Sequence, residues 1–277
     1  MDVTTEPVIA VIGDPIAGNP TQFAMETALD RAGVDARVLS LSLPPHRIAT
    51  ALDGMSAMSF RGVWIDASCQ VPVAEYLAAT GVVNQDVQAS PNSLDGLVAH
   101  EDATDSPAVR ETGPWHPIRL RDPIWTKLVA SRMLDCGYSL RSILIIGGDE
   151  ARQFEIRRFL VNAEHQLGRV QAEQIRCVAK WIPAIDLSDV NLVIWADKDR
   201  PSARPAADAF PHRADLGLLA VDLGYPLDGS VATIDGIDFV SRLDVHAGVM
   251  AATIRRWLGC DVAVDVIRDA IEEYLDL

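Results

Sequence analysis

Short apolar runs alternate with segments of helical periodicity along most of the 277-residue chain. Apolar runs that end at glycine or proline are typical of strands buried in a parallel sheet, whereas apolar residues spaced three and four apart indicate covering helices. The alternation predicts an α/β protein with crossover helices. Strands are expected over residues 8–12, 37–41, 60–65, 142–146, 174–178, 190–196 and 218–223, and helices over 20–31, 46–52, 73–79, 124–134, 151–162, 245–258 and 263–275.

Two segments interrupt this alternation. Residues 101–118 are acidic and proline-rich, so we expect a loop there, with a domain boundary close to its end. Residues 199–213 contain three prolines and are expected to form a loop or a broken helix.

Residues 143–151 run from an apolar strand pattern through Gly147 and Gly148 into a helical pattern. In a βαβ unit, the phosphates of a dinucleotide bind at such a turn, on amides of the helix N-terminus. Here Asp149 and Glu150 stand in the turn. Carboxylates suit a helix N-terminus and can satisfy its amides in place of a phosphate.

The chain is acidic, with a formal net charge of −15 and a pI near 4.7. Binding nucleic acid or an anionic membrane needs a basic face, so both are disfavoured as partners, and a small-molecule partner is expected. No apolar run reaches the roughly 20 residues of a membrane span. Four cysteines show no metal-ligand spacing and are expected to be reduced. We therefore expect a cytoplasmic monomer or homodimer without a metal.

Seven segments carry short motifs in a fixed order along the chain. They are Val11–Thr21, Phe60–Gln70, Ser90–Ser93, Leu120–Pro123, Ser142–Arg152, Val221–Leu227 and the stretch from Asp235 to Gly259. Together these segments resemble motifs of the shikimate dehydrogenase family. The resemblance implies two domains. Residues 1–118 with 245–277 would form an αβα substrate domain with a mainly parallel sheet, and residues 119–244 a Rossmann-like nucleotide-binding domain, with substrate between them.

The resemblance places the proton relay of this family at two positions. Family members oxidise a ring alcohol by passing hydride to NADP, and a Lys–Asp pair exchanges the proton. The Asp falls on Asp122, and the Lys falls on Gln70, which cannot titrate. Losing a positioned acid or base typically lowers the rate by about 10²–10⁴. Asp122 would serve equally as the N-cap of the helix over 124–134.

Four further residues are implied to bind substrate. Asn19 and Thr21 stand where two hydroxyls hold a carboxylate, Tyr225 where a tyrosine assists them, and Asn92 where an asparagine holds ring hydroxyls. Asn19 would also cap the helix over 20–31, and Asn92 and Tyr225 would also suit turns.

The resemblance implies NADP as cofactor, bound by Gly147, Gly148, Asp149 and Gly236. Several positions depart from the family pattern. Asp149 and Glu150 replace small residues, the segment 195–198 begins with Trp195, and no arginine motif for the 2′-phosphate can be placed between residues 167 and 180.

Two further departures concern the second segment of the resemblance. Trp64 stands where the family has asparagine, and Asp66 where it has threonine. Cys69, beside Gln70, is expected to be a buried thiol rather than a nucleophile.

Three functions remain open at this point. The first is a diverged member without dehydrogenase turnover, which binds another small molecule between the domains or acts as a regulatory partner. The second is an active NAD(P)-dependent dehydrogenase of the shikimate or quinate type. The third is another reaction built on the carboxylates of Asp66 and Asp122. The combined departures at the relay and in the cofactor turn favour the first.

Overall fold

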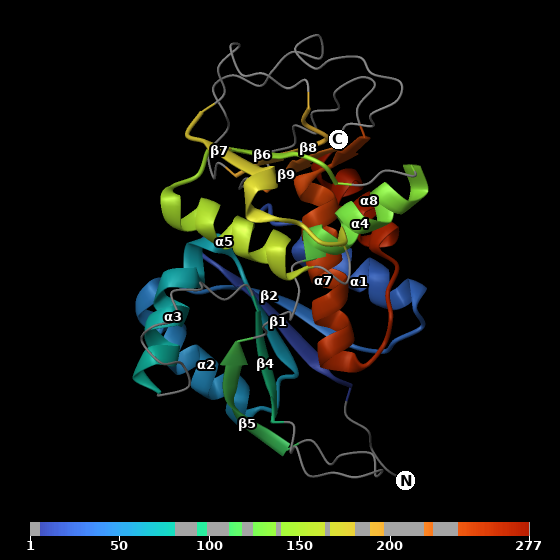
Figure 1. Ribbon diagram of the computed structural model, residues 1–277. Helices are drawn as coiled ribbons and strands as arrows, with labels where there is room; N and C mark the ends of the chain where they lie inside the picture. Colours follow the sequence, from blue (N-terminus) through green and yellow to red (C-terminus); the bar gives the residue numbers. More distant parts are fainter. Residues whose placement is uncertain are drawn as a thin grey trace, which may run out of the picture. The chain divides into compact units, whose positions relative to one another are not determined.

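The chain divides into two compact units, each described by itself (Figure 1). The computed structural model describes residues 6–80, 93–98, 111–117, 124–136, 140–163, 167–180, 189–196, 219–223 and 238–276. Unit 1 comprises Met1–Arg119 with Met250–Asp276, and unit 2 comprises Leu120–Val249 with Leu277. Each unit contains one five-stranded sheet among the described residues.

The sheet of unit 1 is built from β1 (Val8–Gly13), β2 (Arg37–Ser42), β3 (Gly62–Ile65), β4 (Ser93–Val98) and β5 (Glu111–Pro117). The strand order is β2-β1-β3-β4-β5. Strand β1 pairs in parallel with β2 and β3, and the last two pairings are antiparallel. Four of the five strands therefore point the same way, as a mainly parallel sheet requires.

Strand β5 corrects the prediction of a loop over residues 101–118, which is wrong for 111–117. Pro114 and Pro117 lack a backbone N–H, and a strand tolerates this loss at the edge of a sheet, where β5 lies. Trp115 anchors the strand, because its side chain is buried and its Nε1 donates to the Leu52 carbonyl at 2.8 Å. Strand β4 was also not expected.

Helices cover both faces of this sheet. Ala10 and Ile12 of β1 pack with α2 and α3 in one apolar cluster. Ile9 and Val11 are equally buried and, by strand alternation, point to the opposite face. The helices are α1 (Thr21–Arg31), α2 (Ile48–Ala57) after the 3-10 turn η1 (Pro45–Arg47), α3 (Gln70–Ala79) after η2 (Ala67–Cys69), and α8 (Val264–Leu275), which packs on α1.

Unit 2 contains a wholly parallel sheet with the order β10-β9-β8-β6-β7. The predicted strands of this region are confirmed, each within a few residues. They are β6 (Ile143–Ile146), β7 (Ile175–Val178), which follows the 3-10 turn η3 (Ala172–Gln174), β8 (Leu192–Trp195) and β9 (Leu219–Asp222). The sheet has a fifth strand, β10 (Asp238–Val240). The helices are α4 (Ile124–Cys136), α5 (Glu150–Asn162) and α7 (Arg242–Leu258), the last of which continues into unit 1.

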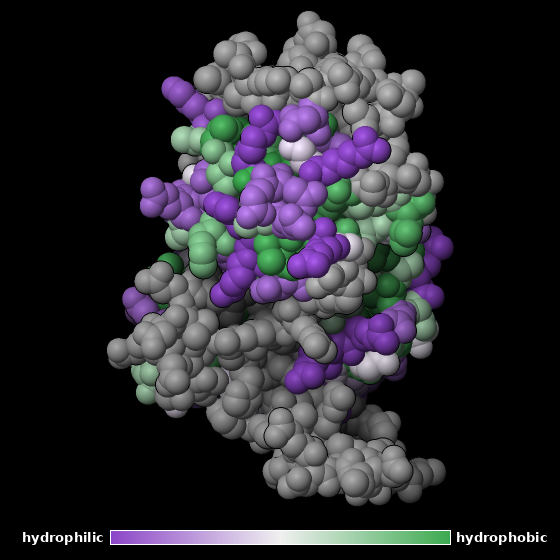
Figure 2. Space-filling view, viewed as in Figure 1, coloured by the Kyte–Doolittle hydropathy of each residue, from purple (hydrophilic) through white to green (hydrophobic). Residues whose placement is uncertain are grey.

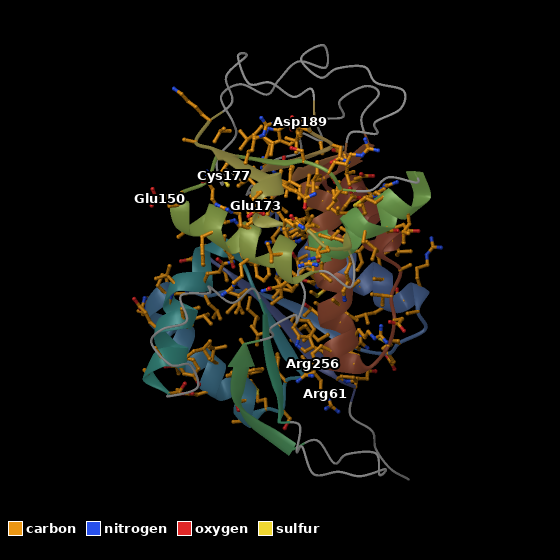
Figure 3. All side chains as sticks on the ribbon, in the orientation of Figure 1. Arg61, Glu150, Glu173, Cys177, Asp189 and Arg256 are labelled. Carbon is orange, nitrogen blue, oxygen red and sulfur yellow. The ribbon has the colours of Figure 1, made fainter. Side chains whose placement is uncertain are left out.

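The visible described surface is mixed in hydropathy. Hydrophilic residues cover much of the coloured part of Figure 2, with separate hydrophobic residues among them. Figure 3 labels three exposed carboxylates of unit 2. Glu150 follows β6 at its carboxyl end, whereas Glu173 and Asp189 precede β7 and β8 at their amino ends.

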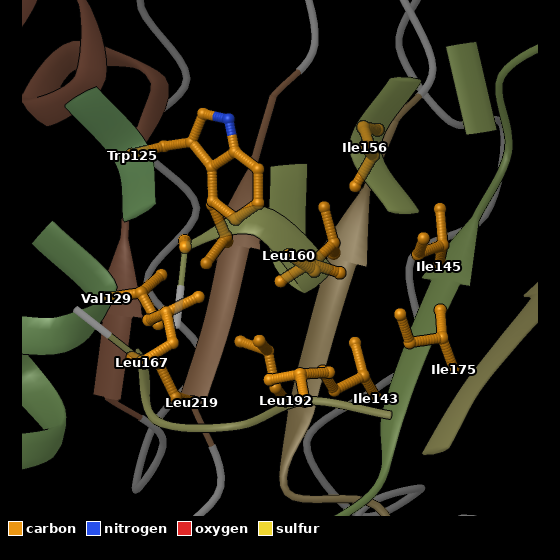
Figure 4. Close-up of a cluster of buried hydrophobic side chains, with 14 of the residues drawn as sticks. Trp125, Val129, Ile143, Ile145, Ile156, Leu160, Leu167, Ile175, Leu192 and Leu219 are labelled. Carbon is orange, nitrogen blue, oxygen red and sulfur yellow. The ribbon is translucent and has the colours of Figure 1, made fainter. Parts of the chain in front are cut away.

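The core of unit 2 lies between its sheet and its helices (Figure 4). Trp125 and Val129 of α4 and Ile156 and Leu160 of α5 pack with Ile143 and other inward side chains of the strands. The apolar face of each of these helices therefore packs on the apolar face of the sheet, as in other α/β domains.

In both sheets the strand order reverses beside an inner strand. The reversal lies between β1 and β3 in unit 1 and between β6 and β8 in unit 2. In open α/β sheets, ligands bind outside the carboxyl ends of strands at such a switch point. These two places are therefore the candidate sites.

Candidate functional sites at the two switch points

The switch point of unit 1 is built around the carboxylate of Asp66. This residue follows β3, and its backbone N–H donates to the Ile12 carbonyl at 2.9 Å. Its Oδ2 accepts from the backbone N–H of Ser68 at 3.0 Å and from the Ser68 hydroxyl at 2.7 Å. Gly13 permits this approach, because a Cβ there would lie 3.1 Å from the Asp66 Cβ. The carboxylate thereby caps η2.

Asn19 connects this carboxylate to α1. Its Nδ2 donates to Asp66 Oδ1 at 3.0 Å, and its Oδ1 accepts from the Thr21 amide at 2.9 Å. The backbone N–H of Asp14 donates to the Ser68 hydroxyl at 2.9 Å. The Asp66 carboxylate therefore accepts three hydrogen bonds at this edge of the sheet. One comes from the side-chain amide of Asn19, and two come from the backbone N–H and the hydroxyl of Ser68. Asn19 therefore holds the first amide of α1 from the position before the N-cap residue Pro20, which is close to the capping role expected for it.

Gln70 begins α3 directly after η2, with a partly buried side chain. Thr21, the other described residue of the substrate set, is buried at the start of α1. An amide at position 70 can donate and accept hydrogen bonds, but it cannot exchange a proton near neutral pH. Asp122, Asn92, Tyr225 and Gly236 lie outside the described residues.

Cys69 is fully buried between Ser68 and Gln70, which confirms the expected buried thiol. Burial raises the pKa of the Cys69 thiol above its usual value, so the thiolate fraction at neutral pH is smaller than for an exposed cysteine. Since the thiolate is the nucleophile, we expect iodoacetamide to alkylate Cys69 more slowly than the partly exposed Cys260 at pH 8. Peptide mass spectrometry after timed labelling measures both rates. Equal rates would contradict a buried, protonated thiol.

The switch point of unit 2 is the turn Gly147–Gly148–Asp149. Both glycines have positive φ angles, 78° and 72°, which glycine adopts without a steric penalty. The Gly147 N–H donates to the Val178 carbonyl at 2.9 Å. Asp149 then caps α5, because its Oδ1 accepts from the Arg152 backbone N–H at 2.8 Å. The predicted capping by Asp149 is confirmed.

Side chains of the same unit hold this turn from its inner side. Gln153 Nε2 donates to the Gly147 carbonyl at 2.9 Å and reaches the Val178 carbonyl at 3.3 Å. A Cβ at Gly148 would lie 3.2 Å from the Ala196 Cβ and 3.3 Å from the Arg152 Cγ. The absence of a side chain at Gly148 thus allows Ala196 and Arg152 to pack closely against the turn.

This arrangement does not fit the pyrophosphate of a dinucleotide. The first-turn amide of Arg152 is used by Asp149, and Glu150 adds a second exposed carboxylate at the helix start. Arg152 does not neutralise them, because its Nη1 pairs with Glu155 at 3.0 Å. A phosphate here would meet two like charges.

None of the helices in the described ranges has the length and apolar character of a membrane span. Within the same ranges, no three His, Cys, Asp or Glu side chains are grouped as metal ligands.

The similarity of this chain to known proteins is found in their structures. No family model and no curated protein matches it. Shikimate 5-dehydrogenase from Thermus thermophilus, in complex with NADP(H) and shikimate, is similar over 97% of this chain and 100% of its own, with a TM-score of 0.60 and 18% identity. The Listeria monocytogenes enzyme, in complex with shikimate and NAD, gives 95% and 96% coverage, a TM-score of 0.59 and 15% identity.

A reductase of a different compound shares the same architecture. Ligand-free 5-ketofructose reductase of Gluconobacter sp. strain CHM43 is similar over 98% of this chain and 99% of its own, with a TM-score of 0.63 and 15% identity. At such identities, structural likeness establishes the fold and leaves function to the sites. The chain therefore has the two-domain α/β fold of the shikimate dehydrogenases, as its motifs predict.

Proposed function

We propose that this protein is a diverged, shikimate dehydrogenase-like protein that binds a small molecule at the carboxyl ends of β1 and β3 and does not perform NADP-dependent shikimate oxidation. The observation that carries the proposal is the 2.8 Å bond from the Arg152 amide to the Asp149 carboxylate. An amide engaged by a carboxylate has no further hydrogen for a phosphate oxygen. Without a bound nicotinamide, the ring alcohol has no hydride acceptor.

The proton relay supports the same proposal. In the family the lysine of the relay would stand at position 70, where this chain has Gln70 at the start of α3. An amide cannot take the proton that leaves the alcohol as hydride is transferred. Even with NADP bound, the rate would fall by about 10²–10⁴. Asp122 is the proposed second member of this relay.

The ligand of unit 1 is proposed to differ from shikimate. The fold is shared by a 5-ketofructose reductase, so it is compatible with more than one small polar substrate. Asp66 engages the side-chain amide of Asn19 and the hydroxyl of Ser68, donors that a substrate carboxylate would otherwise need. We propose that Thr21, Asn92 and Tyr225 contact this ligand, with Asn19 held in place by Asp66.

The proposal assigns roles to the two parts of the chain. Residues 1–118 with 245–277 would bind the small molecule, and residues 119–244 would form a Rossmann-like domain that has lost its nucleotide. The acidic composition disfavours nucleic acid and anionic membranes as partners.

The test is a calorimetric titration of the purified protein with NADP and with NAD. We expect no saturable binding of either, corresponding to a Kd no tighter than about 1 mM. The matched variant Gln70→Lys should likewise show no shikimate oxidation, because the cofactor turn is unchanged. The buffer and the protein without nucleotide serve as controls for heats of dilution.

Two results would favour the alternative, an active NAD(P)-dependent dehydrogenase of the shikimate or quinate type. The first is micromolar binding of NADP or NAD to the unaltered protein. The second is shikimate oxidation by Gln70→Lys, which would mean that the cofactor site works and only the relay is lost. The structural feature that favours this alternative is the Gly147–Gly148 turn, which lies at the switch point where a dinucleotide would bind.

A further inference from the structure

The backbone of the turn in unit 2 retains features that suit an anion. Gly147 and Gly148 both have positive φ, and the turn follows β6 at the switch point of a parallel sheet. It leads into α5, a helix of 13 residues with its N-terminus at the turn. Such a helix presents amides and a positive dipole end to whatever stands there. The geometry of the main chain alone therefore does not explain why phosphate should be excluded.

The groups that occupy the helix start belong to the chain itself. Asp149 Oδ1 lies 2.8 Å from the Arg152 backbone nitrogen, a distance typical of a charge-assisted bond. Glu150, the first residue of α5, is exposed at the same end, as Figure 3 shows. Two carboxylates thus stand where an incoming phosphate would carry its charge.

The basic side chains of α5 do not offset these two charges. Arg152 is engaged with Glu155, and Arg158 lies over the ring of Phe159 at 5.4 Å. Arg157 is exposed nearly two turns from the helix start. Among the charged side chains of α5 and its cap, Asp149 and Glu150 therefore stand nearest the turn.

We propose that the carboxylates of Asp149 and Glu150 are the cause of phosphate exclusion in unit 2, with the Asp149 carboxylate standing in the place of a phosphate oxygen. The turn is then an anion site closed by its own side chains. This inference rests on the proposed function, which states that the dinucleotide is absent, and it assigns that absence to two residues. Removing both carboxylates should open the amides of α5 to a free anion.

The test is a calorimetric titration with inorganic pyrophosphate of the unaltered protein and of the double variant Asp149→Gly, Glu150→Ala. Glycine is tolerated at an N-cap and has no side-chain acceptor, so α5 should still form while the Arg152 amide is released. We expect no detectable binding to the unaltered protein and an affinity at least tenfold higher for the double variant. If the double variant does not fold, as judged by circular dichroism, Asp149→Asn with Glu150→Gln replaces it. This variant keeps the capping oxygen at position 149 and removes both charges, so a gain is expected from the loss of charge repulsion alone.

A matched control separates the local effect from net charge. Glu173→Gln with Asp30→Asn removes the same number of charges from the chain at exposed positions, one beside the amino end of β7 and one near the end of α1. This control should bind pyrophosphate no better than the unaltered protein.

The outcomes distinguish the two proposals. A folded double variant without any gain overturns the inference and leaves the proposed function intact. An equal gain in the control also overturns it, because net charge would then be the cause. Tight binding of NADP to the unaltered protein overturns the proposed function, and the inference with it.

Discussion

Replacing Gly62 by alanine is expected to lower the free energy of unfolding of unit 1 by about 3 kcal/mol. A Cβ at this position would fall inside the van der Waals radii of the indole atoms Cε2, Nε1 and Cδ2 of Trp257. Trp257 is fully buried in α7, and Gly62 lies in β3 between two paired strands, so neither side can move freely. Thermal unfolding should show a fall in the melting temperature of about 10 °C.

Gly54 provides the matched control for this substitution. It lies within α2, and a Cβ there meets no atom within 4 Å. Gly54→Ala should be neutral or stabilising by roughly 0.5–1 kcal/mol, because alanine loses less backbone entropy in a helix. If Gly62→Ala were no more destabilising than Gly54→Ala, the close packing of Trp257 on β3 would be wrong.

Replacing Asp222 by alanine is expected to lower the stability of unit 2 by about 3–5 kcal/mol. Asp222 Oδ2 lies 2.9 Å from Arg242 Nε, and the side chains are only 5% and 11% exposed. Removing the carboxylate takes this counter-charge away from a buried guanidinium, and the weaker compensation of the Arg242 charge is the source of the loss. Urea unfolding followed by hydrogen exchange in β9 and α7 measures the change in this unit.

The double variant Asp222→Leu with Arg242→Met tests the origin of that effect. Replacing a buried ion pair by apolar side chains is often close to neutral, so the double variant should be more stable than Asp222→Ala. Equal or greater destabilisation of the double variant would mean that these residues act through packing or other contacts rather than as a charge pair.

The regular helices and strands could be predicted from the local pattern of apolar and polar residues. The apolar run at 143–146 and the helical period after Glu150 are each produced by neighbours in sequence, and both elements are where the pattern predicts them. The capping by Asp149 was accessible for the same reason, since the carboxylate and the Arg152 amide are three residues apart.

Strand β5 could not be predicted from the local pattern. Its seven residues include two prolines and a glycine, which normally indicate a loop. The strand exists because it adds to the edge of a sheet and because Trp115 is buried against α2, with its Nε1 bonded to the carbonyl of Leu52, 63 residues away. Long-range burial overrode the local preference.

The two candidate sites also differ in whether their contacts join residues that are near or far apart in the sequence. The closed turn of unit 2 follows from adjacent residues, so its acidic character could be recognised in the sequence. The arrangement in unit 1 could not, because Asp66 and Asn19 are 47 positions apart and meet only when β1 and β3 pair in parallel. Adjacent residues interact wherever the chain goes, whereas distant donors and acceptors are brought together only by the register of the sheet, and that register placed the Asp66 carboxylate among them.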